Sequence, residues 1–264
     1  MRDAYDDRSA LTRSGNTNVA HDTPRLLNGF FNATRAYGNE HAVGRAIAEH
    51  PLVRERVFVA TKVWNDEIAA GPEATRGSIV RSLERLGVNA VDLLLLHWPV
   101  PGYLDAWRVL EEAYGQGLTR AIGVSNFQVH HLEDLLEHAN MAPMVNQVEF
   151  HPYLVQPELL RFCRDRHIQH QGWSPLMVGR VDELPVVIEI AESHARTPFQ
   201  VAIRWALQHG SVTIPKSVNP ERIAKNADVS HCEFEVRIAP GADGPPPHYH
   251  VGQDETFAVV SGRW

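Results

Sequence analysis

The chain has 264 residues, a net charge of -7 and a pI near 6.1, and its 44% hydrophobic and 22% charged residues are ordinary for a globular protein. This length can bury a substantial core, and the acidic balance gives no general attraction for nucleic acid or anionic membranes. The two cysteines, Cys163 and Cys232, form no CxxC pattern, so neither a disulfide framework nor a thiolate metal site is indicated.

Residues 1–25 show neither helical nor strand periodicity, and we expect an irregular segment there. This segment is polar and has no apolar core of the kind that signal peptides carry. Nowhere does an apolar run approach the roughly 18 residues of a membrane span. We therefore expect a soluble, cytoplasmic protein with neither a membrane nor a nucleic-acid partner.

Short β-rich runs recur along the chain, and helical patterns lie between them. The predicted strands are 57–62, 91–97, 120–125, 144–150, 168–174 and 212–215, with 26–33 as a seventh. One predicted helix has Ile79, Leu83 and Leu86 at helical spacing before Gly87, and another has Trp107, Leu110 and Tyr114. The βα alternation predicts a parallel sheet wrapped by helices.

Polar and aromatic side chains stand at or just beyond the predicted strand ends. They are Lys62, His97, Ser125, Asn126, Gln147, Trp173 and Lys216. A (β/α)8 TIM barrel has eight such strands and carries its chemistry at their C-terminal ends, so this placement predicts a barrel active site.

The two ends of the chain depart from this pattern. A complete barrel needs another strand and helix within residues 1–25, so we expect a barrel that is incomplete at its N-terminus. After Asp228, a Gly-Pro cluster and alternating apolar residues indicate a short β-rich extension. The expected divisions are an irregular segment (1–25), a barrel (26–229) and a β segment (230–264).

The motifs AYGNE, TKVWN, VDLLLLHWP, AIGVSNF, VNQVEFHP, WSPL and IPKSVNPERIAKN, within residues 36–229, resemble the aldo-keto reductases. The resemblance implies an NADPH-dependent enzyme that reduces aldehyde or ketone carbonyls on a (β/α)8 barrel. It implies that Tyr37 is the general acid, that Lys62 lowers the pKa of Tyr37, and that His97 orients the small-molecule carbonyl substrate. These roles suit the reaction, because a tyrosine with a pKa of about 10 needs a nearby cation to act as an acid near neutral pH.

The same resemblance assigns a cofactor site for NADPH. It places Ser125, Asn126 and Gln147 at the nicotinamide carboxamide, Trp173 against the ring, and Ser174 and Leu176 near the pyrophosphate. A last cluster after residue 215 comprises Lys216, Ser217, Val218, Arg222 and Asn226. Cations, a hydroxyl and the free N–H groups of a helix start suit a 2′-phosphate, so NADPH is expected to bind more tightly than NADH. No GxGxxG follows a strand, which argues against a Rossmann dehydrogenase.

Two tryptophans and an asparagine add to the predicted site. Trp64 and Trp98 directly follow the lysine and histidine motifs and are expected to wall the substrate pocket. Asn32 stands five residues before Tyr37, where the family pattern has an aspartate paired with the lysine. Asn32 is thus either the relic of a catalytic acid or a loop amide.

The C-terminal segment resembles the first half of a cupin. His248, His250 and Glu255 fit the HxHx4E pattern and are candidate metal ligands, because residues i and i+2 of a strand face the same side. The second cupin motif is missing, and a piece this short rarely folds alone, so we expect no working metal site. Three functions follow: an NADPH-dependent reductase, a catalytically impaired NADPH-binding or interaction protein, and a metal-binding cupin-like protein.

Overall fold

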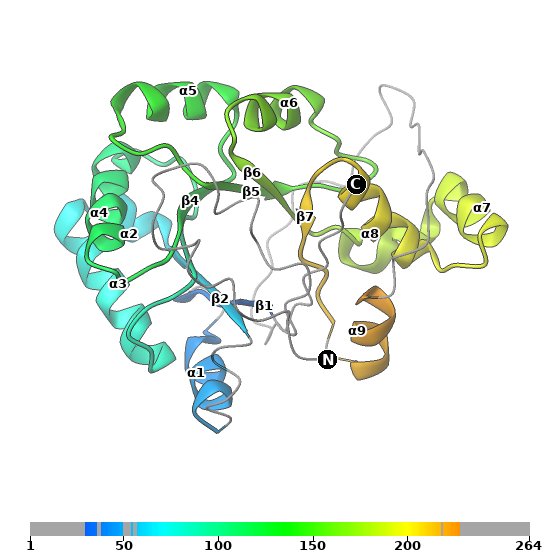
Figure 1. Ribbon diagram of the computed structural model, residues 1–264, viewed down its shortest axis with the longest axis horizontal. Helices are drawn as coiled ribbons and strands as arrows, with labels where there is room; N and C mark the ends of the chain where they lie inside the picture. The colour runs from blue at the N-terminus through cyan, green and yellow to red at the C-terminus, as the bar shows by residue number, and fades with distance from the viewer. Residues whose placement is uncertain (1–29, 36–37, 50–53, 55–56, 218, 228–264) are drawn as a thin grey trace, which may run out of the picture.

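The computed structural model describes residues 30–35, 38–49, 54, 57–217 and 219–227. Within these ranges seven parallel strands form one sheet in chain order, and the sheet curls with helices outside it (Figure 1). The strands are β1 (Phe30–Asn32), β2 (Phe58–Val63), β3 (Leu93–Leu96), β4 (Ile122–Ser125), β5 (Val145–Glu149), β6 (Gln169–Trp173) and β7 (Val212–Thr213).

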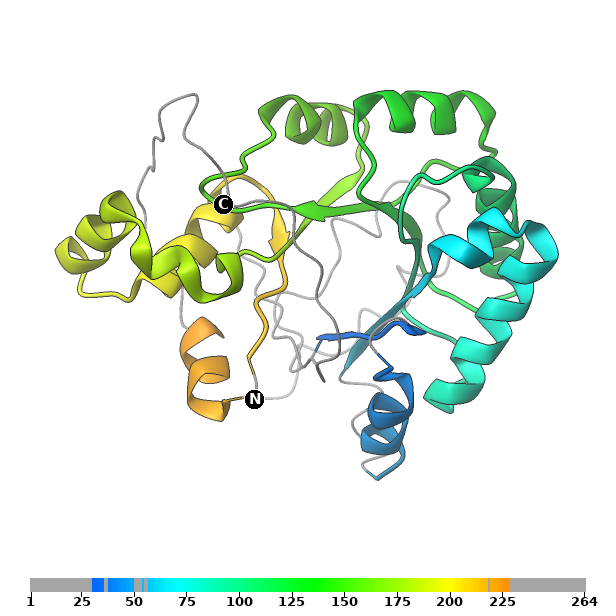
Figure 2. The ribbon, with the colours of Figure 1, turned by 180° about the vertical axis from the view of Figure 1, so that it is seen from behind.

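Helices connect successive strands in the manner of a (β/α) barrel. They are α1 (Glu40–Glu49), α2 (Asn65–Ala69), α3 (Pro72–Leu86), α4 (Tyr103–Gly115), α5 (Val129–His138), α6 (Pro157–Asp165), the 3-10 segment η4 (Met177–Glu183), α7 (Pro185–Ser193), α8 (Pro198–Gln208) and α9 (Pro220–Ala227). Seen from behind, α9 stands beside the segment that follows β7, an arrangement that both views show (Figure 2).

The strand β3 shows why this sequence makes a layered barrel. Its four leucines are all buried, which is typical of a parallel strand covered on both faces. Leu93 and Leu95 belong to one apolar cluster together with Phe30 and Ile214, whereas Leu94 and Leu96 belong to a second cluster. Alternation along the strand therefore fills two separate cores from one run of leucines.

Local signals fix where the helices begin and end. In α8, Thr197 Oγ1 accepts from Gln200 N at 3.2 Å and Gln200 Oε1 accepts from Thr197 N at 3.0 Å, a reciprocal cap before Pro198 at the first helical position. Gly87 ends α3 with φ of 62°, a left-handed conformation that glycine adopts without strain.

The structure confirms the predicted strands between 57 and 215. The strand β2 has the predicted length but is shifted by one residue, the others are a little shorter than predicted, and the predicted run 26–33 contains β1. The expected segments 1–25 and 230–264 lie outside the described residues. Among the described residues β7 does not pair with β1, and the expectation that the barrel is incomplete at its N-terminus stays a prediction. Within the described ranges, none of the helices has the length and apolar character of a membrane span.

Candidate active site and cofactor cavity

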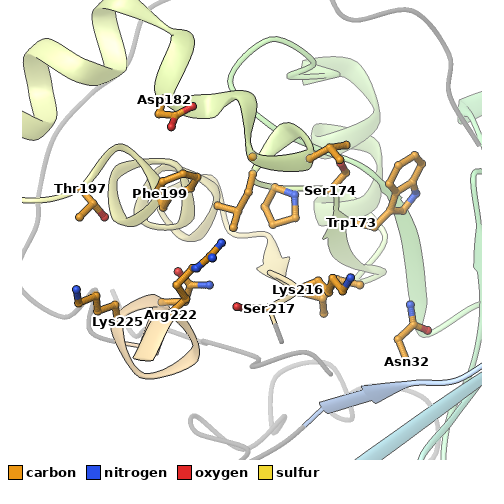
Figure 3. Close-up of a pocket in the computed structure, with 16 residues that line it drawn as sticks. Asn32, Trp173, Ser174, Asp182, Thr197, Phe199, Lys216, Ser217, Arg222 and Lys225 are labelled. Carbon is orange, nitrogen blue, oxygen red and sulfur yellow. The ribbon is translucent and has the colours of Figure 1, made fainter. Parts of the chain in front are cut away.

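A cavity of about 730 Å³ lies beyond the C-terminal ends of β1, β6 and β7, between these strands, η4, α8 and α9. Figure 3 shows Asn32 and Trp173 on one side of it and Arg222 and Lys225 on the other, with Lys216 and Ser217 between. We call the first side the reaction end and the second the phosphate end. The η4 segment and the start of α8 form a further wall, the η4–α8 wall, which contains Leu176, Val178, Asp182, Thr197 and Phe199.

At the reaction end, neighbouring strands bring an amide and an ammonium together. Asn32 is the last residue of β1 and Lys62 lies near the end of β2, and Lys62 Nζ donates to Asn32 Oδ1 at 2.8 Å. Both residues are only 3% exposed. Asn32 is therefore a buried strand residue that faces the lysine, and it lines the cavity. An uncharged amide solvates the ammonium but does not neutralise it.

The imidazole of His97 is held just beyond β3. Its ring stacks on Trp64 with the centroids 4.0 Å apart, and its Nδ1 lies 3.2 Å from Asn65 Oδ1. Burial, followed by the nearby positive charge of Lys62, lowers the pKa of His97 to about 3. His97 is therefore uncharged at neutral pH, and its ring adds no second positive charge beside the ammonium of Lys62.

Polar groups at the ends of β4, β5 and β6 form one hydrogen-bonded network. Ser125 Oγ donates to the Gln147 carbonyl at 2.8 Å, and Asn126 Nδ2 donates to the His97 carbonyl at 3.0 Å. Trp173 Nε1 donates to Asn126 Oδ1 at 3.0 Å. Asn126 has φ of 63°, a left-handed conformation that asparagine tolerates better than most residues. The network joins the histidine to the tryptophan at the cavity wall.

The phosphate end is cationic, but its helix terminus is already satisfied. Arg222 and Lys225 are exposed residues of α9, and Lys216 precedes that helix. Asn219 Oδ1 accepts from the backbone N–H groups of residues 221 and 222, at 2.9 and 3.2 Å. The expectation that free N–H groups of the helix start converge on an anion is therefore wrong for these two groups. The positive charge at this end therefore comes from cationic side chains.

The structure brings eight of the predicted residues to the cavity. Those that line it are Asn32, Trp173, Ser174, Leu176, Lys216, Ser217, Arg222 and Asn226. Ser125, Asn126, Gln147, Lys62 and His97 are not part of the lining.

Other predicted residues lie away from the cavity or outside the described ranges. Trp64 and Trp98 pack against His97, and Trp98 is 38% exposed, while neither lines the cavity. Their role as substrate walls stays a prediction. Tyr37, Val218, His248, His250 and Glu255 lie outside the described residues.

Sequence reasoning missed four residues of the η4–α8 wall: Val178, Asp182, Thr197 and Phe199. Asp182 belongs to η4, and Thr197 and Phe199 stand at the start of α8. The cap pattern at Thr197 and Pro198 marks that helix start, but only the fold turns it toward the cavity. Lys225 also lines the cavity.

Comparison with known proteins gives consistent relatives. The model of the aldo/keto reductase family matches residues 26–237. Glyoxal reductase of Bacillus subtilis is 48% identical over 226 residues, covering 84% of this chain and 80% of the relative. Methylglyoxal reductase DkgA of Escherichia coli is 41% identical over 199 residues, covering 74% and 71%.

Solved structures agree with these sequence relatives. The aldo-keto reductase MGS-M4, from a deep-sea metagenome library, superposes with a TM-score of 0.74 at 40% identity, covering 78% of this chain and 77% of that chain. A mutant of Gox0644 in complex with NADPH gives a TM-score of 0.72 at 40% identity, covering 78% and 75%. On the strength of its sheet, its strand-end residues and these relatives, the chain belongs to the aldo/keto reductase family.

Proposed function

We propose that this protein reduces carbonyl groups of small aldehydes or ketones to alcohols, with NADPH as the reductant. The observation that carries the proposal is the two-ended cavity, which has the buried Lys62 beside Asn32 at one end and the cations Arg222 and Lys225 at the other, with Lys216 between them. Such a cavity suits a long ligand whose reactive part is at one end and whose anionic part is at the other.

The donor set fits NADPH. A carboxamide needs amide and hydroxyl partners, and Ser125, Asn126 and Gln147 would provide them: they are not part of the cavity lining, but they stand at the strand ends next to Trp173, which is. A 2′-phosphate needs cations, and Lys216 and Arg222 would hold it. When bound, NADPH supplies the hydride that the carbonyl carbon receives.

The chain's own residues would supply the proton and orient the substrate carbonyl. By the family resemblance Tyr37 gives its hydroxyl proton to the developing alkoxide, and the ammonium of Lys62 favours the tyrosinate that remains. His97, with its pKa lowered to about 3, meets the carbonyl as a neutral ring. Stacking on Trp64 and contact with Asn65 hold this ring in one orientation.

The relatives suggest which carbonyl compounds to try first. One is named a glyoxal reductase and another a methylglyoxal reductase, so small 2-oxoaldehydes are the substrate class we propose.

Two measurements on the full chain test the proposal. Fluorescence titration should show that NADPH binds at least about tenfold more tightly than NADH, which corresponds to about 1.4 kcal/mol. Loss of NADPH absorbance with methylglyoxal should show turnover. Equal affinity for the two cofactors would contradict the phosphate end, and absence of turnover with any simple aldehyde would contradict the reductase activity.

Asn32 favours a second candidate, an NADPH-binding protein with impaired catalysis. The side chain that accepts from Lys62 Nζ at 2.8 Å is the amide of Asn32, at the position where the family pattern has an acid. In this case NADPH still binds with its preference over NADH, and the rate of aldehyde reduction is very low. The two measurements above separate this candidate from an active reductase.

A further inference from the structure

A second glutamine stands beside the one assigned to the nicotinamide. Gln147 on β5 lies opposite Gln171 on β6 in the strand register. Gln147 Nε2 donates to Gln171 Oε1 at 2.7 Å, and the two residues are 1% and 5% exposed. This is a short, buried hydrogen bond between two side chains of adjacent strands.

Because both glutamines are buried, it matters which of the two donates the hydrogen bond and which accepts it. Burying a side-chain amide without a hydrogen-bond partner costs roughly 1 to 3 kcal/mol of stability. A buried glutamine is therefore expected to orient its amide toward a group with which it can form a hydrogen bond. When Nε2 of Gln147 is held by Gln171, the carbonyl oxygen of Gln147 points away from Gln171. That oxygen is an acceptor, and a nicotinamide carboxamide carries N–H donors.

The same strand also fixes a second amide of the site. Trp173 lies two residues after Gln171, so both side chains project from one face of β6. Trp173 Nε1 donates to Asn126 Oδ1 at 3.0 Å. One face of β6 thus sets the orientation of amides that belong to two other strand ends, those of β4 and β5.

We propose that Gln171 is a positioning residue for NADPH: it holds Gln147 so that Gln147 Oε1 faces the carboxamide NH2 group. The inference rests on the proposed function, because that function places the nicotinamide beside Gln147. Gln171 does not touch the cofactor and acts through Gln147 alone. Its effect is therefore confined to ligands whose nicotinamide has amide N–H groups.

The test compares reduced NADPH with reduced 3-acetylpyridine adenine dinucleotide phosphate, in which a methyl group replaces the carboxamide NH2. Dissociation constants are measured by fluorescence titration of the full chain. The wild type should favour NADPH by about tenfold, a ratio expected of one well-made hydrogen bond. In Gln171→Met, which keeps the side-chain length, this preference should fall to about twofold or less.

Two further variants make the test specific. Gln171→Glu keeps an acceptor for Gln147 Nε2 and should keep the wild-type preference. Gln169→Met is the matched control, because Gln169 lies on the same strand but donates to the carbonyls of His170 and Gly210. It should also keep the preference. Gln171→Asn shortens the side chain by one methylene group, which moves the acceptor oxygen away from Gln147 Nε2. This variant is used if Gln171→Met does not fold.

The outcomes separate the inference from the proposed function. A tenfold preference that persists in Gln171→Met and Gln171→Asn would overturn the positioning role, as would an equal loss in Gln169→Met. Tight binding of NADPH by a wild type that does not distinguish the analogue would overturn the inference and leave the reductase standing. Failure of the wild type to bind NADPH would overturn both.

Discussion

The two ends of the cavity hold positive charge in different ways. At the reaction end Lys62 is 3% exposed and is carried on a strand, with Asn32 Oδ1 2.8 Å from its ammonium. At the phosphate end Arg222 and Lys225 are exposed on α9, a helix at the edge of the barrel. Burial raises the strength of electrostatic interactions, whereas solvent and salt screen exposed charges.

From this difference we expect single substitutions at the two ends to differ in their effects on the reaction rate and on cofactor binding. A change of charge beside Lys62 alters an interaction between two side chains that are each only 3% exposed, so it should change the reaction rate substantially. A change of one exposed cation leaves the others in place and is partly compensated by solvent. The reaction end should therefore determine turnover, and the phosphate end should determine which cofactor binds.

The largest effect should come from restoring a carboxylate at the reaction end. In Asn32→Asp the carboxylate pairs with Lys62, and removing one member of a buried ion pair costs about 3 to 5 kcal/mol. A well-placed, charged lysine lowers the pKa of Tyr37 more effectively. We expect kcat to rise at least about tenfold, with little change in the Kd for NADPH, in steady-state kinetics with one aromatic aldehyde.

Asn39→Asp is the control for this change. Asn39 is also buried, at 1% exposure, but its Oδ1 accepts from the backbone N–H of Thr34 and not from a lysine. Its kcat should not rise. An unaltered kcat in Asn32→Asp would mean that the asparagine is not what limits turnover.

A smaller effect is expected at the phosphate end. Arg222→Leu removes one of the cations that line the cavity with Lys216 and Lys225. The preference for NADPH over NADH should fall by about tenfold, and the preference of the wild type should weaken with added salt because the site is exposed. Titration of both cofactors at two salt concentrations measures this. Arg164→Leu, at an exposed arginine of α6, should leave the preference intact.

Much of the fold could be predicted from local signals in the sequence. The leucines of β3 and the Gly87 stop of α3 encode their elements directly, because burial on both faces and a left-handed cap depend on nearby residues. The curl of the sheet depends on pairing between strands that are 30 or more residues apart. The sequence predicts this only through the βα alternation.

The candidate site divides in the same way. Lys62, His97 and Lys216 were predictable because each stands at a strand end, and strand ends meet at one face of a barrel. Asp182 and Phe199 were not, because the path of the chain after β6 decides which of its residues reach the cavity. The Gln147–Gln171 bond also needs the strand register, which no local motif encodes.

The smallest expected effect is on the pH dependence of the free energy of unfolding, to which the buried part of the reaction end contributes through His97. The pKa of His97 is lowered from 6.5 to about 3, first by burial and then by the charge of Lys62. Between those pH values the unfolded chain binds a proton that the folded chain does not. His97 therefore contributes stability above about pH 6.5 that is lost as the pH falls toward 3.

Urea unfolding at pH 7 and pH 4 should reveal this contribution. The wild type should lose about 1 kcal/mol more between the two pH values than His97→Gln, a figure reduced for the partial exposure of the ring. His138→Gln, at an exposed histidine of α5, should lose as much stability as the wild type. Equal losses in the wild type and His97→Gln would show that the imidazole takes up its proton without unfolding. The reaction end would then be open enough to solvate a charge, and the contrast between the two ends of the cavity would disappear.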